Sequence, residues 1–263
     1  MKMQIIEQEL NIIREKLLED FIDPFETYEL REFLMSGSKL IRSSVAILYL
    51  KLQNIEINDD IRKILLAGEF IHNASLLHDD VIDDAEYRRN KKTISKITSP
   101  KISILAGDYL LSNAISKLLE LKKLEILQSF EKCTKKMPEA EIKQFFLREI
   151  LPTEKEYINI CKGKTASLFS AILESCAILL GLDAAIAKEF GEKFGICFQI
   201  NNDLNKDSAE IDIKNGIYTA NDVLGIEKTN ILLDNFKGDL RDLISNFPNN
   251  EYKEELEGII NLL

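Results

Sequence analysis

Four aspartates within six positions form the most chemically suggestive feature of the sequence: Asp79, Asp80, Asp83 and Asp84. They follow directly on a strongly apolar stretch. If this stretch is a helix, Asp79 and Asp83 lie one turn apart on the same face. Two like charges at this spacing destabilise a helix by roughly 0.2–0.5 kcal/mol. A hard divalent cation such as Mg²⁺ would neutralise them, because it takes oxygen ligands and keeps some of its waters. The cluster therefore predicts a Mg²⁺ site.

Two arginines, Arg88 and Arg89, follow the aspartates within one or two turns. Arginine suits paired hydrogen bonds to phosphate, and Mg²⁺ held by one or two carboxylates commonly also holds a substrate phosphate. Carboxylates, metal and arginines together indicate a diphosphate site. The structural alternative is an acidic helix end in solvent, and His72 and His78 could each be core residues rather than ligands.

Helices must carry these residues, because apolar residues recur every three or four positions along nearly the whole chain and alternating β-branched runs are scarce. Asn58 can cap a helix that runs from about Asp59 into the aspartates. The apolar residues of this helix cover nearly all of its faces, which is typical of a helix inside a bundle.

Local signals place further helix boundaries. Thr153 and Glu156 form a capping box that predicts a helix start. Gly181 and then Asp183 predict the end of one helix and the start of another, which would run to about Asp207. Loops are expected near residues 23–24, 88–100, 208–216 and 246–250. The expected fold class is therefore all-α, a single domain over residues 1–263 with more than four helices in one bundle.

The composition limits the class of protein. In 263 residues, 34 lysines and arginines against 44 aspartates and glutamates leave a net charge of −10, which argues against nucleic-acid binding, since that needs a basic face. The four cysteines form no CxxC pair, so we expect reduced thiols in a cytoplasmic protein. The most apolar stretch, residues 166–182, is interrupted by Glu174 and is shorter than the roughly 20 residues that a membrane span needs. A buried helix is expected there, and no membrane span.

The segment EFIHNASLLHDDVIDDAEYRRN, residues 69–90, strongly resembles the first aspartate-rich motif of the trans-type isoprenyl (polyprenyl) diphosphate synthases, most closely their long-chain, octaprenyl-type members. Four other segments resemble motifs of this family in the family's order: GSKLIR at 37–42, GDYLL at 107–111, KTA at 164–166 and FQI at 198–200. The resemblance implies an all-α helical bundle around a central cavity, the isoprenoid synthase fold, usually dimeric. It also implies Mg²⁺-dependent condensation of an allylic prenyl diphosphate with isopentenyl diphosphate.

The resemblance implies a role for each residue that matches a motif. Mg²⁺ on the allylic diphosphate would be held by Asp79, Asp80 and Asp83, and the same diphosphate would contact Arg88. Isopentenyl diphosphate would be held by Lys39, Arg42, His72 and Arg89. The reacting carbons and the leaving group would face Lys164, Thr165 and Gln199.

The length of the product is expected to depend on the residues one turn before Asp79. In the family, bulky aromatic residues there give short products and small residues open a tunnel for a longer chain. Here they are Ala74 and Ser75, both small. The resemblance therefore predicts a product longer than farnesyl diphosphate.

The second aspartate-rich motif of the family reads DDxxD, and this chain departs from it. The aligned residues are Asn202-Asp203-Leu204-Asn205-Lys206, so the first and last aspartates are replaced. If the helix continues, Asp207 lies one turn after Asp203, and we expect these two to hold the remaining metal in a shifted register. The family's GGKRxRP segment is also altered, at Ser38, Leu40 and Ser43.

Three functions stay open at this point. The intact first motif favours an active trans-polyprenyl diphosphate synthase, expected as a homodimer. The altered second motif favours a non-catalytic, synthase-like subunit that binds prenyl diphosphate or completes a heterodimer. A terpene cyclase on a related fold is disfavoured, because a cyclase takes no isopentenyl diphosphate and needs no residues to hold it.

Overall fold

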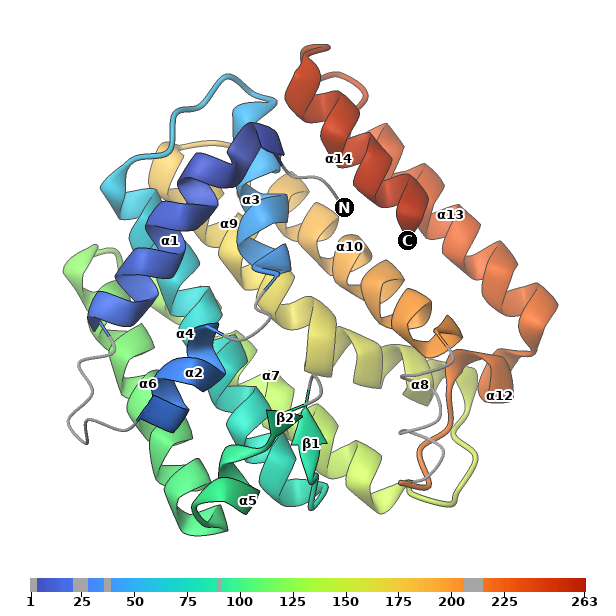
Figure 1. Cartoon of the computed structure of the whole chain (residues 1–263). Coiled ribbons are helices and arrows are strands. Elements are labelled where there is room, and N and C mark those ends of the chain that lie inside the picture. Colours follow the sequence, from blue (N-terminus) through green and yellow to red (C-terminus); the bar gives the residue numbers. More distant parts are fainter. Residues whose placement is uncertain (1–3, 21–27, 36–38, 89–90, 206–214) are drawn as a thin grey trace. The chain divides into compact units, whose positions relative to one another are not determined.

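The computed structural model describes residues 4–20, 28–35, 39–88, 91–205 and 215–263. The chain forms two compact units. We call residues 2–50 and 55–127 the N-terminal unit, and residues 51–54 and 128–263 the C-terminal unit. Helices make up both units, apart from one short ribbon of two strands in the described residues (Figure 1). The expectation of one domain over residues 1–263 stays a prediction.

The N-terminal unit contains most of the shorter elements. They are η1 (Gln4–Ile6), α1 (Glu7–Asp20), α2 (Tyr28–Met35), α3 (Ile41–Lys51), α4 (Asp59–Ile82), β1 (Tyr87–Arg88), β2 (Lys91–Lys92), α5 (Ile94–Ile97) and α6 (Pro100–Glu120). The next helix, α7 (Leu124–Phe146), begins in this unit and continues into the other.

Helix α4 is the core of the N-terminal unit and confirms the predicted helix after Asn58. The Asn58 side chain accepts a hydrogen bond from the backbone N–H of Ile61 and so caps the helix. Buried residues occur on nearly all of its faces. It packs chiefly against α6, where the Ser103 hydroxyl donates to the carbonyl of Leu77 at 2.8 Å.

The stretch 88–100 was predicted as a loop, and this prediction is wrong in part. Strands β1 and β2 pair antiparallel, and α5 follows before α6 begins. Thr93 fastens the ribbon, because its N–H donates to the carbonyl of Glu86 and its hydroxyl to that of Ala85. Strands of two residues are too short to leave an alternating pattern in a sequence.

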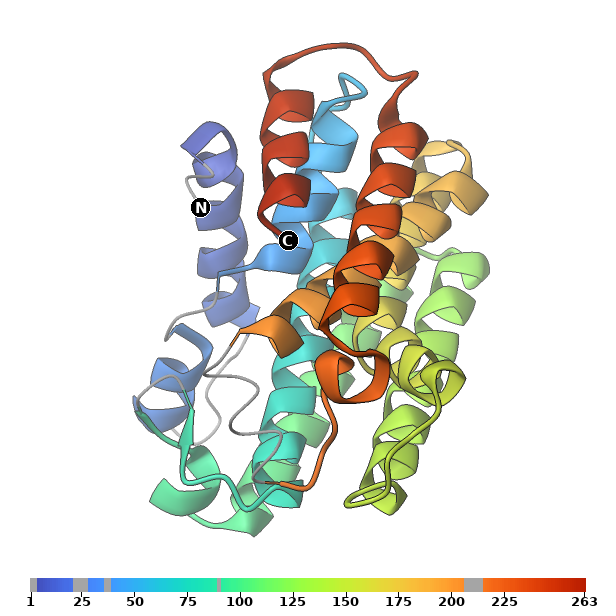
Figure 2. The same cartoon turned by 90° about the vertical axis from the view of Figure 1, so that its right-hand side faces the viewer.

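The C-terminal unit is built on one long helical stretch. α8 (Glu154–Cys161), the π-helical turn η2 (Lys162–Ala166) and α9 (Ser167–Leu180) follow one another without a break. The remaining helices are α10 (Ala184–Leu204), α12 (Ala220–Leu224), α13 (Ile226–Ile244) and α14 (Glu251–Leu262). α13 and α14 lie side by side, joined by the predicted loop near residues 246–250 (Figure 2).

The predicted starts of α8 and α10 and the predicted end of α9 are confirmed. Thr153 and Glu156 form the capping box at the start of α8. α9 ends at Gly181, whose φ of 69° is left-handed, and the Asp183 side chain caps α10. Among the described residues, Glu154–Leu180 is the one stretch long and apolar enough to cross a membrane. However, 67% of its most apolar window is buried within the structure, as expected of a core helix. All four cysteines are buried thiols.

Helices α9 and α10 pack against each other so closely that glycines are required between them. A Cβ atom on Gly195 would lie 2.3 Å from the Cα of Ala166, and one on Gly191 would lie 2.7 Å from the carbonyl oxygen of Phe169. Backbone atoms cannot move aside as a flexible side chain can. The two glycines thus bring α10 against the helical stretch that carries Lys164 and Thr165.

We predict that Gly195→Ala destabilises the protein, because the new methyl group must push two helices apart. The expected loss is about 1–3 kcal/mol, typical of overpacking in a core. Gly238→Ala is the control, since Gly238 lies inside α13 with no atom within 4 Å of an added Cβ. That control should gain about 0.5–1 kcal/mol. Urea unfolding measures both, and equal stability of the two variants would contradict the close packing.

Candidate active site

Two of the predicted carboxylates share one face at the end of α4. Asp79 lies in the last turn and Asp83 caps the helix, with its N–H donating to the carbonyl of Asp79 at 2.9 Å. Both are half-buried, as are His72 and Ser75 earlier on the helix. The face predicted from the spacing is therefore present and partly open.

Asp80 differs from its neighbours, because it is fully buried. Its Oδ1 accepts a hydrogen bond from the Nε atom of Arg88 at 2.7 Å, a charge-assisted pair in which the arginine keeps 30% of its side chain exposed. Asp80 thus fixes Arg88, which lies on β1, near the end of α4. The metal role expected for Asp80 stays a prediction.

Two residues predicted to hold isopentenyl diphosphate flank the start of α3. Lys39 is exposed, Arg42 is half-buried in the first turn, and Leu40 between them has a left-handed φ of 46°. The N-terminus of a helix favours anions, because its first N–H groups point outward and its dipole is positive there. Arg89, predicted to join them, lies outside the described residues.

The GDYLL segment lies on α6, and its glycine leaves the space that the His78 side chain fills. A Cβ atom on Gly107 would lie 2.3 Å from the Nε2 atom of His78. This nitrogen lies 3.2 Å from the carbonyl oxygen of Ile104 and 3.4 Å from the Oδ1 atom of Asp108. His78 therefore serves to join α4 to α6, which supports the structural alternative for this histidine.

In the C-terminal unit a chain of hydrogen bonds connects three predicted residues. The Thr165 hydroxyl donates to Oε1 of Gln199 at 2.7 Å, and Nε2 of Gln199 donates to Oδ1 of Asp203 at 2.8 Å. The Tyr157 hydroxyl and the backbone N–H of Ala220 both donate to the other carboxylate oxygen, at 2.7 and 3.0 Å. Sequence reasoning missed Tyr157, which lies 46 positions from Asp203. Tyr157, Gln199 and Asp203 border a cavity of about 100 Å³.

Lys164 stands on the π-helical turn and faces the same cavity. Its Nζ atom lies 2.6 Å from Oε2 of Glu141 and donates to Oε1 of Gln144 at 2.8 Å, both on α7. π-Helical turns inside α-helices are rare and are often found at functional sites. The sequence contained no signal for the turn or for the two α7 partners.

The predicted pairing of Asp203 with Asp207 stays a prediction, but the expected extent of its helix is wrong. α10 ends at Leu204 rather than near Asp207, and Asn205 has an extended backbone with ψ of 121°. Asp207 itself lies outside the described residues. Asp203 is 5% exposed, and burial raises the pKa of its carboxyl group, against the hydrogen bonds from Tyr157, Gln199 and Ala220, which lower it. The two oxygens of this carboxyl group accept three hydrogen bonds in all.

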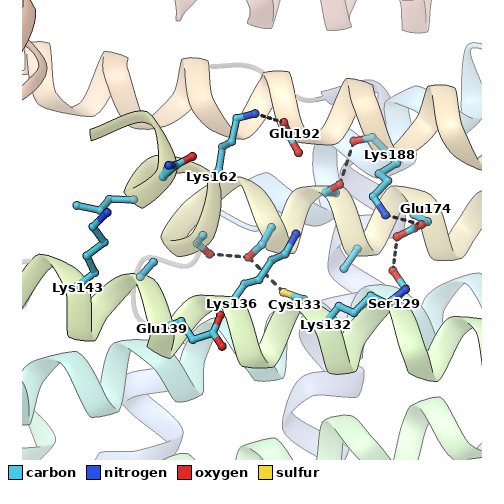
Figure 3. Close-up of a pocket in the computed structure, with 17 residues that line it drawn as sticks. Ser129, Lys132, Cys133, Lys136, Glu139, Lys143, Lys162, Glu174, Lys188 and Glu192 are labelled. Atoms are coloured by element: carbon cyan, nitrogen blue, oxygen red, sulfur yellow. Dashed lines mark hydrogen bonds and ion pairs between the residues drawn. The ribbon is translucent and has the colours of Figure 1, made fainter. Parts of the chain in front are cut away.

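A larger hollow of about 340 Å³ lies elsewhere in the C-terminal unit, between α7, the α8–α9 stretch and α10 (Figure 3). Five lysines and three glutamates line it, and two ion pairs join them, Lys162 with Glu192 and Lys188 with Glu174, both at 2.8 Å. None of the residues predicted for the site lines it. The hollow is therefore separate from the candidate site.

Comparisons with known proteins agree with this picture. The sequence pattern of the polyprenyl synthetase family matches residues 26–237. A prenyl transferase of Cyanidium caldarium is 31% identical over 205 residues, which cover 76% of this chain and 62% of that protein. The octaprenyl diphosphate synthase of Escherichia coli K12 is 32% identical over 172 residues, 64% of this chain and 53% of that protein. The chain thus matches 53–62% of the length of these two relatives.

Solved structures share the fold. A decaprenyl diphosphate synthase from Rhodobacter capsulatus has a TM-score of 0.87 at 20% identity, over 98% of this chain and 96% of that one. A polyprenyl synthase from Caulobacter crescentus CB15, complexed with calcium and isoprenyl diphosphate, has a TM-score of 0.87 at 22% identity, over 98% and 95%. The predicted all-α isoprenoid synthase fold is confirmed.

We predict that Tyr157→Phe lowers the free energy of unfolding by about 1.5–3 kcal/mol, the range for a hydrogen bond to a charged group. The variant keeps the ring and removes one of three donors to the buried Asp203. Tyr218→Phe is the matched control, because Tyr218 borders the same cavity and its hydroxyl has no hydrogen bond to any described residue. Urea unfolding compares them. Equal stabilities would show that the Tyr157 hydroxyl does not support Asp203.

Proposed function

The chain belongs to the polyprenyl synthetase family, and we propose that it is a Mg²⁺-dependent prenyltransferase. Its substrates would be an allylic prenyl diphosphate and isopentenyl diphosphate, and its product a trans-polyprenyl diphosphate longer than farnesyl. One observation carries the proposal: Asp79 and Asp83 share a half-buried face at the end of α4, while the buried Asp80 fixes Arg88 close by. A diphosphate with its cation needs acidic and basic groups arranged in this way.

The donor set fits a hard cation. Asp79 and Asp83 offer carboxylate oxygens, the ligand type that Mg²⁺ prefers. Within the described residues no three His, Cys, Asp or Glu side chains converge to hold an ion alone. Two protein carboxylates leave room for water and for diphosphate oxygens. The calcium and isoprenyl diphosphate in the Caulobacter relative support a divalent ion beside a diphosphate.

The chain's own residues would bind and orient both substrates. Arg88 would hold the allylic diphosphate, and the isopentenyl diphosphate would be held by Lys39, Arg42, His72 and Arg89. When bound, Mg²⁺ would supply positive charge that stabilises the departing diphosphate. Fixing two substrates in register removes much of the entropic barrier to their reaction.

The condensation requires no protein nucleophile. The carbon–oxygen bond of the allylic diphosphate breaks, and the double bond of isopentenyl diphosphate forms a new carbon–carbon bond to the allylic carbon. The proton then lost from the new chain goes to the departed diphosphate. Lys164, Thr165 and Gln199 would face the reacting carbons, and the bonds from Thr165 to Gln199 and from Gln199 to Asp203 support a fixed orientation.

A second candidate function is a non-catalytic subunit that binds prenyl diphosphate or completes a heterodimer. The observation that favours it is the state of the second motif. Asn202 replaces an aspartate, and Asp203 is buried with three hydrogen-bond donors. Activity of the protein purified alone distinguishes the two functions.

We propose that two copies of the chain associate as a homodimer through α6. This helix exposes a stripe of large apolar residues, Ile104, Leu105, Ile115 and Leu119, each at least 44% exposed. Exposed apolar residues gathered on one helix face are typical of association surfaces, and a two-fold axis would let this face cover its own copy. The four buried thiols also support a reducing, cytoplasmic setting.

We predict that Asp83→Asn lowers kcat by about 100-fold or more, because it removes one of two carboxylates for the cation. Asp84→Asn is the matched control, since Asp84 is 85% exposed and pairs with Lys96. Initial rates of isopentenyl diphosphate incorporation, measured across a Mg²⁺ titration, compare the variants, and chelation of the metal should abolish the wild-type rate. Equal rates of both variants would exclude Asp83 as a metal ligand.

We predict that Ser75→Phe shortens the product, whereas Ala74→Phe destabilises the fold. Ser75 is half-buried on the face that carries Asp79, while Ala74 is fully buried in the core. An added ring at Ala74 is expected to cost about 1–3 kcal/mol or more. Mass spectrometry sizes the products, and thermal unfolding reports stability. Wild-type products from Ser75→Phe would contradict the predicted tunnel.

A further inference from the structure

A buried carboxyl group in the middle of α4 connects this helix to the start of α3. Glu69 is 1% exposed, and its Oε1 atom accepts two hydrogen bonds from Ser43. The Ser43 hydroxyl donates at 2.7 Å and its backbone N–H at 3.2 Å. Ser43 is itself fully buried. Two residues that are 26 positions apart are thus held together without access to water.

This contact gives a hydrogen-bond partner to a backbone N–H group in the first turn of α3. The first helical hydrogen bond of α3 runs from the Ser44 N–H to the carbonyl of Leu40 at 2.8 Å, so the Ser43 N–H has no partner within the helix. A buried N–H without a partner is unfavourable. A carboxylate beside it is favoured by the helix dipole. Glu69 therefore determines where the first turn of α3 is anchored, just after the left-handed turn at Leu40.

We propose that Ser43 and Glu69 are positioning residues for isopentenyl diphosphate, an inference that rests on the function proposed above. They fix the first turn of α3, and with it Lys39 and Arg42, onto α4. His72, the third predicted ligand on the described chain, lies one turn after Glu69 on α4. The contact therefore ties all three groups to one helix.

The same geometry separates the two substrates. Asp79 lies ten residues after Glu69 on α4, which corresponds to about 15 Å along a helix. The groups proposed for the allylic diphosphate are thus far from this contact, whereas Arg42 is the direct neighbour of Ser43. Loss of the contact should weaken binding of isopentenyl diphosphate and spare the allylic diphosphate.

The contact also depends on a departure of this sequence from its family. The GGKRxRP segment places a proline where this chain has Ser43. A proline has neither a hydroxyl nor a backbone N–H, so it could donate neither hydrogen bond to Glu69. The serine thus replaces a rigid residue with a specific pair of hydrogen bonds.

Ser43→Ala tests the proposal, with Ser44→Ala as its matched control. Both serines are fully buried in the same turn, but the Ser44 hydroxyl donates to the carbonyl of Leu40, just before α3. Calorimetry measures the binding of isopentenyl diphosphate to the full chain with Mg²⁺ and without an allylic substrate. Steady-state rates give KM for each substrate and kcat, and thermal unfolding reports on the fold.

We expect Ser43→Ala to raise the Kd and KM of isopentenyl diphosphate by about tenfold, the value of one hydrogen bond to a charged group. In Ser43→Ala the KM of the allylic diphosphate should stay within about twofold, because the groups proposed to hold it lie about 15 Å further along α4. Ser44→Ala should leave all constants within about twofold, because the Ser44 hydroxyl bonds to Leu40 and not to Glu69. Glu69→Gln retains an oxygen at Oε1 for both donors and should keep most of the affinity.

Equal effects of the two serine variants on isopentenyl diphosphate would overturn the proposal, as would an equal rise of both KM values. A wild-type protein that binds no isopentenyl diphosphate would refute the proposed function, and the positioning role with it. A wild type that binds the substrate while Ser43→Ala matches Ser44→Ala would refute the positioning role alone.

Discussion

The burial of α4 is the constraint on which the rest of the N-terminal unit depends. This helix is apolar on nearly all faces, yet two carboxyl groups, Glu69 and Asp80, are buried along it. Buried charges are tolerated only when they are paired or hydrogen-bonded. Ser43 donates a hydrogen bond to Glu69, and Arg88 donates one to Asp80. Ser43 thereby holds α3 beside α4, and Arg88 holds β1 beside it. The half-buried Asp79 and Asp83 lie on a different face of α4.

The C-terminal unit also contains a buried carboxyl group that is stabilised by hydrogen bonds. Asp203 is buried at the end of α10 and collects hydrogen bonds from Tyr157 on α8, Gln199 on its own helix and Ala220 on α12. The π-helical turn between α8 and α9 presents Lys164 and Thr165 toward this cluster. In both units a buried carboxylate orients residues that are themselves expected to meet substrate. The acidic residues of these segments therefore have a structural role as well as a chemical one.

Local signals in the sequence were sufficient for much of the fold. Caps at Asn58, Thr153 and Asp183 act within one turn, so spacing alone predicted them. The face of Asp79 and Asp83 followed from helical periodicity for the same reason. The bonds of Ser43 to Glu69 and of Tyr157 to Asp203 join residues 26 and 46 positions apart, and no local pattern encodes them. The end of α10 at Leu204 was also missed, because the spacing of carboxylates does not show where a helix stops.

Chain elongation by the protein purified alone is the most direct test of this account. The protein would receive Mg²⁺, isopentenyl diphosphate and, in separate reactions, dimethylallyl, geranyl or farnesyl diphosphate, and mass spectrometry would size the products. We expect products longer than farnesyl diphosphate, formed without any partner protein and despite Asn202. A folded protein that binds the diphosphates but extends none of the three primers would contradict this expectation and favour the non-catalytic subunit.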